Sequence, residues 1–330
     1  MMYYIESDST DPHYNLALEQ YVFDTLSVDH NVFMLWRNDN AIIVGKHQNT
    51  VGEINPAYVA EKGIRVVRRL SGGGAVYHDL GNVNFTFIVT AGNLGAFDFA
   101  SFCRPVVRAL AQLGVEAEIN GRNDMTIDGK KFSGNAQYCK RGRVMHHGTI
   151  LYDSDLSVVG AALNVSKDKI ESKGLKSVQS RVTNVKAFMN ADIPVEAFMR
   201  SLRDAMFREN EMEEYTLTPE DIAAVTKLRH DVYETWDWNY GASPAYSICK
   251  ERRIEGCGKI EVHMNVAKGI VTDAAFYGDY FGNSDAAEIA VRLTGHRLET
   301  DEVRQALAGV DIGEYFHNLD MESFIAILTQ

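Results

Sequence analysis

Residues 68–82 read RRLSGGGAVYHDLGN, and this stretch says more about the fold than any other part of the chain. Its three consecutive glycines, Gly72 to Gly74, leave backbone N–H groups without side-chain cover and permit a positive φ. Two arginines and a serine stand beside them. Guanidinium groups, bare amides and a hydroxyl together suit a phosphate or a carboxylate. The stretch therefore predicts an anion-binding loop.

The same glycines have a second interpretation, in which they only form the tight turn of a hairpin. Downstream, the alternation of Phe85, Phe87 and Val89 predicts a strand directly after the loop. A Walker loop needs a lysine after its last glycine, and a dinucleotide fingerprint needs a helix there. If this loop binds a nucleotide, it does so outside both common motifs.

The composition is that of an ordinary globular protein. Of the 330 residues, 45% are hydrophobic and 24% are charged, which allows one large domain and a small one. No apolar run reaches the roughly 18 residues of a membrane span, and the N-terminus lacks the basic and apolar regions of a signal peptide. The cysteines have neither zinc nor disulfide spacing. We therefore expect a cytoplasmic protein that inserts no segment into a membrane.

The charge distribution favours small anions over nucleic acid. The net charge of −12 argues against nucleic-acid binding, which needs a basic surface. Residues 62–69 and 130–143 nevertheless form two basic islands without an acidic residue. In an acidic protein, such islands favour focused recognition of an anion, and solvated surface charge is the alternative.

Periodicity and turn residues divide the chain into a large part, residues 1–246, and a small part, residues 247–330. Residues 167–184 lack periodicity and are expected to form a loop that closes over the site. In the large part we expect strands at 32–36, 41–46, 64–68, 83–89, 115–119 and 144–152, a hairpin with an Asp-Gly turn at 126–134, and helices at 12–26, 97–113, 155–163, 194–209 and 219–235. In the small part we expect a hairpin over 260–278 and helices at 284–293, 299–307 and 321–328.

Lys131 is the second candidate for chemistry. It follows the predicted Asp-Gly turn, and the small residues after it would let its ammonium approach a ligand closely. A compact positive charge suits a phosphate or carboxylate whose charge shifts during a reaction. Asp124 lies shortly upstream and could hold Mg²⁺ against phosphates. A surface lysine and a turn aspartate are the alternatives.

Histidines offer weaker signals. His146 and His147 are adjacent on a predicted strand, so their rings point to opposite faces and cannot easily bind one metal. Packed or hydrogen-bonded histidines are therefore predicted. Ser71 and His78 suggest a nucleophile with its base, but no third group marks a triad.

Taken in order, these motifs resemble those of the lipoate–protein ligase family. The resemblance implies a biotin/lipoate-ligase-like α/β (α+β) fold with a mixed, largely antiparallel sheet and flanking helices, and a small α+β C-terminal domain that rearranges during catalysis. The similarity is carried by residues 68–82, Gly121 to Asp124, Lys131 with Ser133 and Gly134, His146 to Thr149, Ser180 to Asn184, and Trp236 to Gly241.

The resemblance also implies an enzyme that makes lipoyl-adenylate from lipoate and ATP. The lipoyl group would then pass to a lysine on the lipoyl domain of an E2 subunit or on the glycine cleavage H protein. Mg²⁺ would accompany ATP, and the chain would be a monomer. The implied contacts are Arg69, Gly74, Ala75, Val76 and Tyr77 with ATP, Lys131 with both ATP and lipoate, and Ser71, His78 and His147 beside lipoate.

Two other functions remain open from the residues. One is an ATP-independent octanoyl or lipoyl transferase that works through a cysteine thioester, for which Cys139 is the cysteine nearest the motifs. The other is a non-catalytic sensor of nucleotide or lipoate. The presence of both Lys131 and the glycine loop argues against a sensor.

Overall fold

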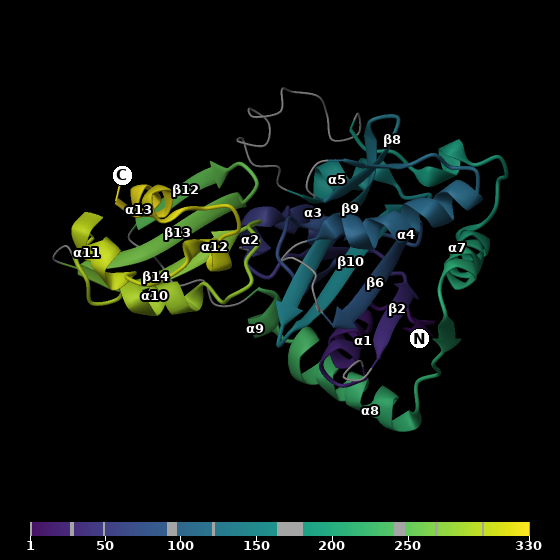
Figure 1. Cartoon of the computed structure of the whole chain (residues 1–330), viewed down its shortest axis with the longest axis horizontal. Helices are drawn as coiled ribbons and strands as arrows, with labels where there is room; N and C mark the ends of the chain where they lie inside the picture. The colour runs from purple at the N-terminus through teal and green to yellow at the C-terminus, as the bar shows by residue number, and fades with distance from the viewer. Residues whose placement is uncertain are drawn as a thin grey trace.

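A computed structural model describes residues 2–26, 30–48, 50–90, 98–120, 123–163, 181–240, 248–267, 270–298 and 300–329. Figure 1 shows a large sheet with helices on its faces and a smaller α+β part beside it. Across the described residues, no helix combines the length and apolar character needed to cross a membrane.

The large sheet confirms the predicted mixed, largely antiparallel arrangement. Its strand order is β11-β1-β2-β6-β10-β9-β8-β7. Strand β1 runs parallel to β2 and β11, while the other neighbours are antiparallel. The strands are β1 (Met2–Glu6), β2 (Asn31–Trp36), β6 (Asn82–Thr90), β7 (Glu118–Asn120), β8 (Asp124–Ile127), β9 (Lys130–Lys140), β10 (Arg143–Leu151) and β11 (Met212–Glu214).

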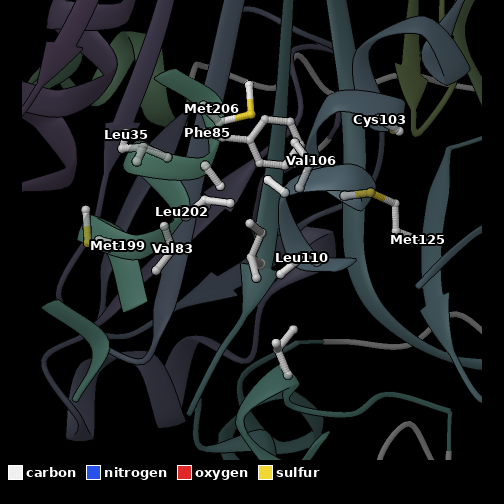
Figure 2. Packing of buried hydrophobic residues seen from close by; sticks show 14 of the residues in the cluster. Leu35, Val83, Phe85, Cys103, Val106, Leu110, Met125, Met199, Leu202 and Met206 are labelled. Carbon is white, nitrogen blue, oxygen red and sulfur yellow. The ribbon is translucent and has the colours of Figure 1, made fainter. Parts of the chain in front are cut away.

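Side-chain alternation along β2 shows how the two faces of this sheet are covered. Phe33 and Leu35 point into a core formed with helices α4 (Phe99–Gln112) and α7 (Val195–Glu209). Figure 2 shows this core, where Leu35 and Phe85 face side chains such as Val106 and Leu202. Their neighbours Val32 and Met34 point to the opposite face, toward helix α1. The sheet is therefore buried on both sides.

A separate three-stranded sheet, ordered β4-β3-β5, holds the glycine loop between two of its strands. Its strands are β3 (Ala41–Val44), β4 (Arg65–Arg68) and β5 (Val76–His78). Strand β3 lies in the middle, parallel to β4 and antiparallel to β5. Because β4 and β5 flank β3 rather than pair with each other, the hairpin interpretation of the glycines is wrong.

The remaining helices of the large part cover the sheets and connect them. The predicted start of α1 is confirmed, because the Asp11 side chain accepts from the His13 N–H and Pro12 occupies the first turn. Besides α1 (Pro12–Asp24), they are α2 (Thr50–Glu53), α3 (Pro56–Glu61), α5 (Leu156–Ala162), a 3₁₀ turn (Val185–Phe188), α8 (Pro219–Leu228), a π turn (Arg229–Tyr233) and α9 (Trp236–Asn239).

The small part has a core and a sheet of its own. The sequence predicted two strands there, but the structure has three, because residues 248–254 add an edge strand beside the predicted hairpin. The predicted boundary after residue 246 falls within 241–247, outside the described residues, and stays a prediction. The elements are β12 (Ile248–Ile254), β13 (Gly258–Ala267), β14 (Ile270–Gly278), α10 (Ala287–Leu293), α11 (Thr300–Ala306), α12 (Ile312–Tyr315) and α13 (Met321–Thr329).

The buried carboxylate of Asp221 joins α8 to α1. It accepts hydrogen bonds from the Tyr21 hydroxyl at 2.6 Å, the Tyr215 hydroxyl at 2.9 Å and the Thr218 N–H at 2.8 Å. Burial alone would raise the pKa of Asp221, but hydrogen bonds from Tyr21 and Thr218 outweigh it and hold this pKa below its ordinary value.

A depressed pKa in the folded state stabilises the protein above the unfolded-state pKa, and that stabilisation is lost as the pH falls. Asp221→Asn is therefore expected to lower the free energy of unfolding near neutral pH. The deficit relative to the wild type should shrink below about pH 4, the ordinary range for aspartate. Urea unfolding at both pH values measures this, and an equal deficit at both would contradict it.

Candidate functional site

Arg69 is folded into the glycine loop and holds its shape. Its Nη2 donates to the carbonyl oxygens of Gly72 at 2.7 Å and Gly74 at 2.9 Å, and its Nη1 donates to that of Ile43 at 3.0 Å. Its Nε donates to the Ser71 hydroxyl at 3.0 Å. Burial lowers the pKa of Arg69 to about 10, so the buried guanidinium is still charged at neutral pH. The predicted contact of Arg69 with ATP stays a prediction, since its described contacts go to strand β3 and to the glycine loop itself.

Arg68 fixes the junction before the small part. Its Nε donates to the Trp238 carbonyl at 3.0 Å, and its backbone N–H donates to the Asn239 side chain at 2.9 Å. The Trp238 indole N–H donates back to the Arg68 carbonyl at 2.9 Å. The aromatic segment at 236–240, part of one of the motifs that carry the family resemblance, thus docks directly beside the glycine loop.

The first basic island is largely neutralised or used for structure. Lys62 pairs with Glu61 at 2.9 Å, and Arg65 lies 3.5 Å from Asp11. Both arginines of the loop also hydrogen-bond to the protein, so the described contacts of this island are internal, and its predicted recognition of an anion stays a prediction.

Ser71 has a different partner from the one considered in the sequence. Its hydroxyl lies 2.6 Å from Nε2 of His147, and Nδ1 of His147 lies 2.8 Å from Oε1 of Glu19. His78 instead faces Asn38, at 3.1 Å from its Nδ1, and burial lowers the pKa of His78 to about 3. Ser71 and His147 are therefore brought together, whereas His78 is a neutral ring beside them.

Sequence reasoning missed Glu19, although a signal was available. In helix α1, buried positions include Asn15, Leu16 and Val22. Glu19 follows Asn15 by four residues and precedes Val22 by three, so it belongs to the same face. A carboxylate on an inward-facing helical stripe needs a partner, because unpaired buried charges are costly.

Lys131 lies at the start of strand β9, beside the turn that joins it to β8. The predicted hairpin between β8 and β9 is confirmed, with Asp128 at φ 51° and Gly129 at φ 72° in its turn. The Lys131 Nζ lies 2.7 Å from the Asp124 carboxylate, and both side chains are partly exposed. Its backbone N–H donates to the Arg181 carbonyl at 2.8 Å, so this motif meets a second one from far along the chain.

The Lys131 ammonium and the glycine loop lie on the same face of the large sheet. A β-carbon at Gly134 would be 3.0 Å from the Lys131 Nζ, so the ammonium covers that glycine. Gly134 and Ala136 share one face of β9, and Ala136 pairs with His147 on β10. His147 in turn contacts Ser71 of the loop. Two groups suited to anions therefore line one face of the sheet.

His146 belongs to the opposite face, as its position next to His147 predicted. Its ring hydrogen-bonds Gln137 at 3.0 Å and Asn135 at 3.2 Å and stacks on Phe102 at 4.7 Å between ring centroids. Burial holds the pKa of His146 well below its ordinary value. It is a packed, neutral histidine, which confirms the prediction.

The small part contacts the glycine loop directly. The Tyr280 ring stacks on His47 at 4.4 Å, and a β-carbon at Gly72 would lie only 2.5 Å from the Tyr280 carbonyl oxygen. The next residue, Phe281, is buried against Phe99 and Ala136. Gly72 is thus required for this close approach, independently of any ligand.

The described residues do not assemble a metal-ligand group of three or more His, Cys, Asp or Glu side chains. Mg²⁺ with a nucleotide typically takes one or two carboxylates and completes its shell with phosphate oxygens and water. Asp124 supplies one carboxylate, already paired with Lys131. Its role toward Mg²⁺ stays a prediction, and no step below depends on it.

Together, the sheet and the site define a class of α/β protein in which a glycine loop and a strand lysine, two groups suited to anions, share one face of a sheet. The family described as "Lipoyl protein ligase A/B catalytic domain" matches residues 11–207, and "Bacterial lipoate protein ligase C-terminus" matches residues 243–328. The chain belongs to the lipoate–protein ligase family.

Curated relatives match over the whole length. The chain is 43% identical to lipoate-protein ligase LplJ of Bacillus subtilis, covering 99% of this chain and 100% of the relative. It is 40% identical to lipoate–protein ligase 1 of Staphylococcus aureus, covering 100% of both.

Solved structures share the fold. P. falciparum LipL1 in complex with lipoate covers 100% of this chain and 98% of its own, with a TM-score of 0.80 at 23% identity. Lipoate-protein ligase A bound with ATP covers 73% of this chain and 98% of its own, with a TM-score of 0.61 at 26% identity. A bipartite ligase from Thermoplasma acidophilum, studied with its E2 lipoyl domain, covers 75% of this chain and 98% of its own, with a TM-score of 0.64 at 27% identity.

Proposed function

We propose that this chain is an ATP-dependent lipoate–protein ligase that works in two steps. In the first step a lipoate carboxylate oxygen attacks the α-phosphorus of ATP, the bond to the β-phosphate breaks, and pyrophosphate leaves. In the second step a protein lysine amine attacks the acyl carbon of lipoyl-AMP. The carbon–oxygen bond to AMP then breaks, and the amine loses a proton as the amide forms.

The observation that carries this proposal is the shared face of the Lys131 ammonium and the Arg69-shaped glycine loop. The first step brings together two anions that repel each other. Fixed positive charge and backbone N–H groups offset that repulsion and stabilise the charge that develops at phosphorus. We assign to Lys131 contacts with both lipoate and the α-phosphate, and to Gly74, Ala75, Val76 and Tyr77 the contact with ATP.

The relatives support both substrates. The ATP complex and the lipoate complex belong to proteins of this fold. We place the lipoate beside Ser71 and His147, because these residues line the loop side of the same face.

We infer that the acceptor is a lysine on a protein domain, and the archaeal ligase studied with its E2 lipoyl domain supports a protein acceptor. We propose E2 lipoyl domains and the glycine cleavage H protein as acceptors. Because the acceptor lysine is itself the nucleophile, the second step needs no nucleophile from this chain.

The direct test is to incubate the chain with ATP, lipoate and purified lipoyl domains. Lipoate-dependent pyrophosphate release reports the first step, and the intact mass of each carrier reports the second. A carrier that gains the mass of a lipoyl group while no pyrophosphate is released would contradict the ligase mechanism.

Cys139 is poorly suited to the thioester of an ATP-independent transferase. Burial raises the pKa of the Cys139 thiol to about 11, so very little thiolate forms at neutral pH. We therefore expect Cys139→Ala to keep lipoylation within about twofold of the wild type. Carrier mass after reaction with and without ATP measures this, with Cys139→Ser as the size-matched control. Loss of ATP-independent transfer in Cys139→Ala would instead support the transferase.

A further inference from the structure

Glu19 is a buried carboxylate to which the proposed mechanism gives no role. Only 2% of its surface is exposed, and its Oε1 accepts from the Thr86 hydroxyl at 2.7 Å while lying 2.8 Å from Nδ1 of His147. We propose that Glu19 is a positioning residue for the first step, acting through His147 and Ser71 to fix Arg69 and the glycine loop. This inference rests on the proposed ligase function.

The donor-only groups at the two ends allow one continuous direction for the hydrogen bonds along this series of side chains. At one end the indole N–H of Trp36, which can only donate, points to the Thr86 hydroxyl at 3.0 Å. The Thr86 hydroxyl must therefore donate onward, to the Glu19 carboxylate. An ionised carboxylate can only accept hydrogen bonds, so Glu19 can be the last acceptor in this series of hydrogen bonds.

At the other end stands Arg69, whose Nε also can only donate. It donates to the Ser71 hydroxyl, which in this direction donates a hydrogen bond to Nε2 of His147 and has the Gly72 carbonyl, 3.5 Å away, as a second acceptor. In the neutral ring Nδ1 then carries the hydrogen and donates to Glu19. Two donor-only groups thus converge on one carboxylate through this series of hydrogen bonds.

Glu19 also supplies the charge that balances Arg69 indirectly. The described contacts of the buried guanidinium go to three carbonyl oxygens and one hydroxyl, all of them neutral. The carboxylate of Glu19 lies two groups away and favours the charged form of Arg69. Without that charge, the loop would be held by an uncompensated buried cation.

The arrangement Ser71–His147–Glu19 also has the order of a nucleophile, base and orienting acid. Ser71 is 1% exposed, and its oxygen already accepts from Arg69. We therefore assign it to positioning rather than to an acyl-serine intermediate. Intact mass of the enzyme after mixing with lipoate and ATP tests this, because a covalent lipoyl adduct that disappears in Ser71→Ala would overturn the assignment.

The experiment compares Glu19→Gln, Ser71→Ala and the double variant in lipoate-dependent pyrophosphate release. Glu19→Gln is expected to lower kcat at least tenfold, with the KM for lipoate changed by less than about threefold. Because Glu19 and Ser71 belong to the same series of hydrogen bonds, the kcat of the double variant should be no lower than that of the slower single variant. A merely structural role would show as loss of folded protein rather than as this kinetic pattern.

The matched control is Asp221→Asn, which alters another buried carboxylate packed on α1 but is not connected to the loop. Its kcat should match that of the wild type, and circular dichroism should show all variants folded. A Glu19→Gln enzyme with wild-type kcat, a raised KM for lipoate alone, or multiplied effects in the double variant would overturn the inference. Absence of release by the wild type would instead reject the ligase function itself.

Discussion

Lys131→Ala is expected to lower lipoate-dependent pyrophosphate release at least a hundredfold while leaving the protein folded. Removing one preorganised charge-stabilising contact from a transition state typically costs roughly 2–4 kcal/mol. Lys131 is proposed to face both reacting anions, so its loss removes the attraction that brings them together. A continuous pyrophosphate assay at saturating ATP and lipoate measures the effect.

The neighbouring lysine gives a matched control for this variant. Lys130 belongs to the same strand and is exposed, but it points to the opposite face from Lys131. Lys130→Ala changes the net charge equally and should retain near wild-type release. Asp124→Asn removes the ion pair but keeps the Lys131 ammonium. It therefore distinguishes an effect of losing the ammonium from an effect of losing the ion pair. Near-normal release by folded Lys131→Ala would remove Lys131 from the mechanism.

Local features of the fold were predictable because short-range rules decide them. The Asp-Gly turn before Lys131 follows from the need for positive φ at two consecutive residues. The opposite environments of His146 and His147 follow from the two-residue period of a strand. Helix starts such as Asp11-Pro12 follow from capping chemistry.

Long-range placement was not predictable in the same way. The sequence predicts β3, β4 and β6, but neither the short strand β5 nor the position of β3 between β4 and β5 in a sheet of its own. Nothing local to Gly72 predicts that its missing side chain leaves room for the Tyr280 carbonyl. Likewise, Arg68 and Arg69 belong to a basic island in the sequence, yet Arg68 binds the distant segment at Trp238, and Arg69 binds strand β3 and its own glycine loop.

Glu19 lies between these two cases. Its helical spacing places it on the buried face of α1, but its partners His147 and Thr86 come from strands far along the chain. Periodicity therefore predicts that a buried carboxylate exists, and only the packing of α1 on the sheet shows which groups satisfy it. The sequence predicted the candidate anion-binding residues, but not the hydrogen bonds that connect them to Glu19.

Gly148→Ala is expected to destabilise the protein by about 3 kcal/mol, at the upper end of the usual cost of overpacking a core. A β-carbon at this position would lie 2.1 Å from Oδ1 of Asn135 and 2.4 Å from the Phe85 ring. Both neighbours are buried, and Asn135 Oδ1 already bonds His146 at 3.2 Å, so neither can move without cost. Urea or thermal unfolding measures the loss.

Gly160→Ala is the counterpart that isolates packing from the change of residue type. Gly160 lies in α5, and among the described residues no atom beyond its own helix backbone and chain neighbours is within 4 Å of the β-carbon it would gain. Alanine favours a helix over glycine by about 1 kcal/mol, so this variant should be equally or more stable than the wild type. If the free energy of unfolding falls in Gly148→Ala and rises in Gly160→Ala, Gly148 is required because the Phe85 ring and Asn135 fill the space that a side chain would occupy. Equal, small effects would mean that the sheet relaxes around position 148, and the close packing of β6 and β10 would then not explain the glycine.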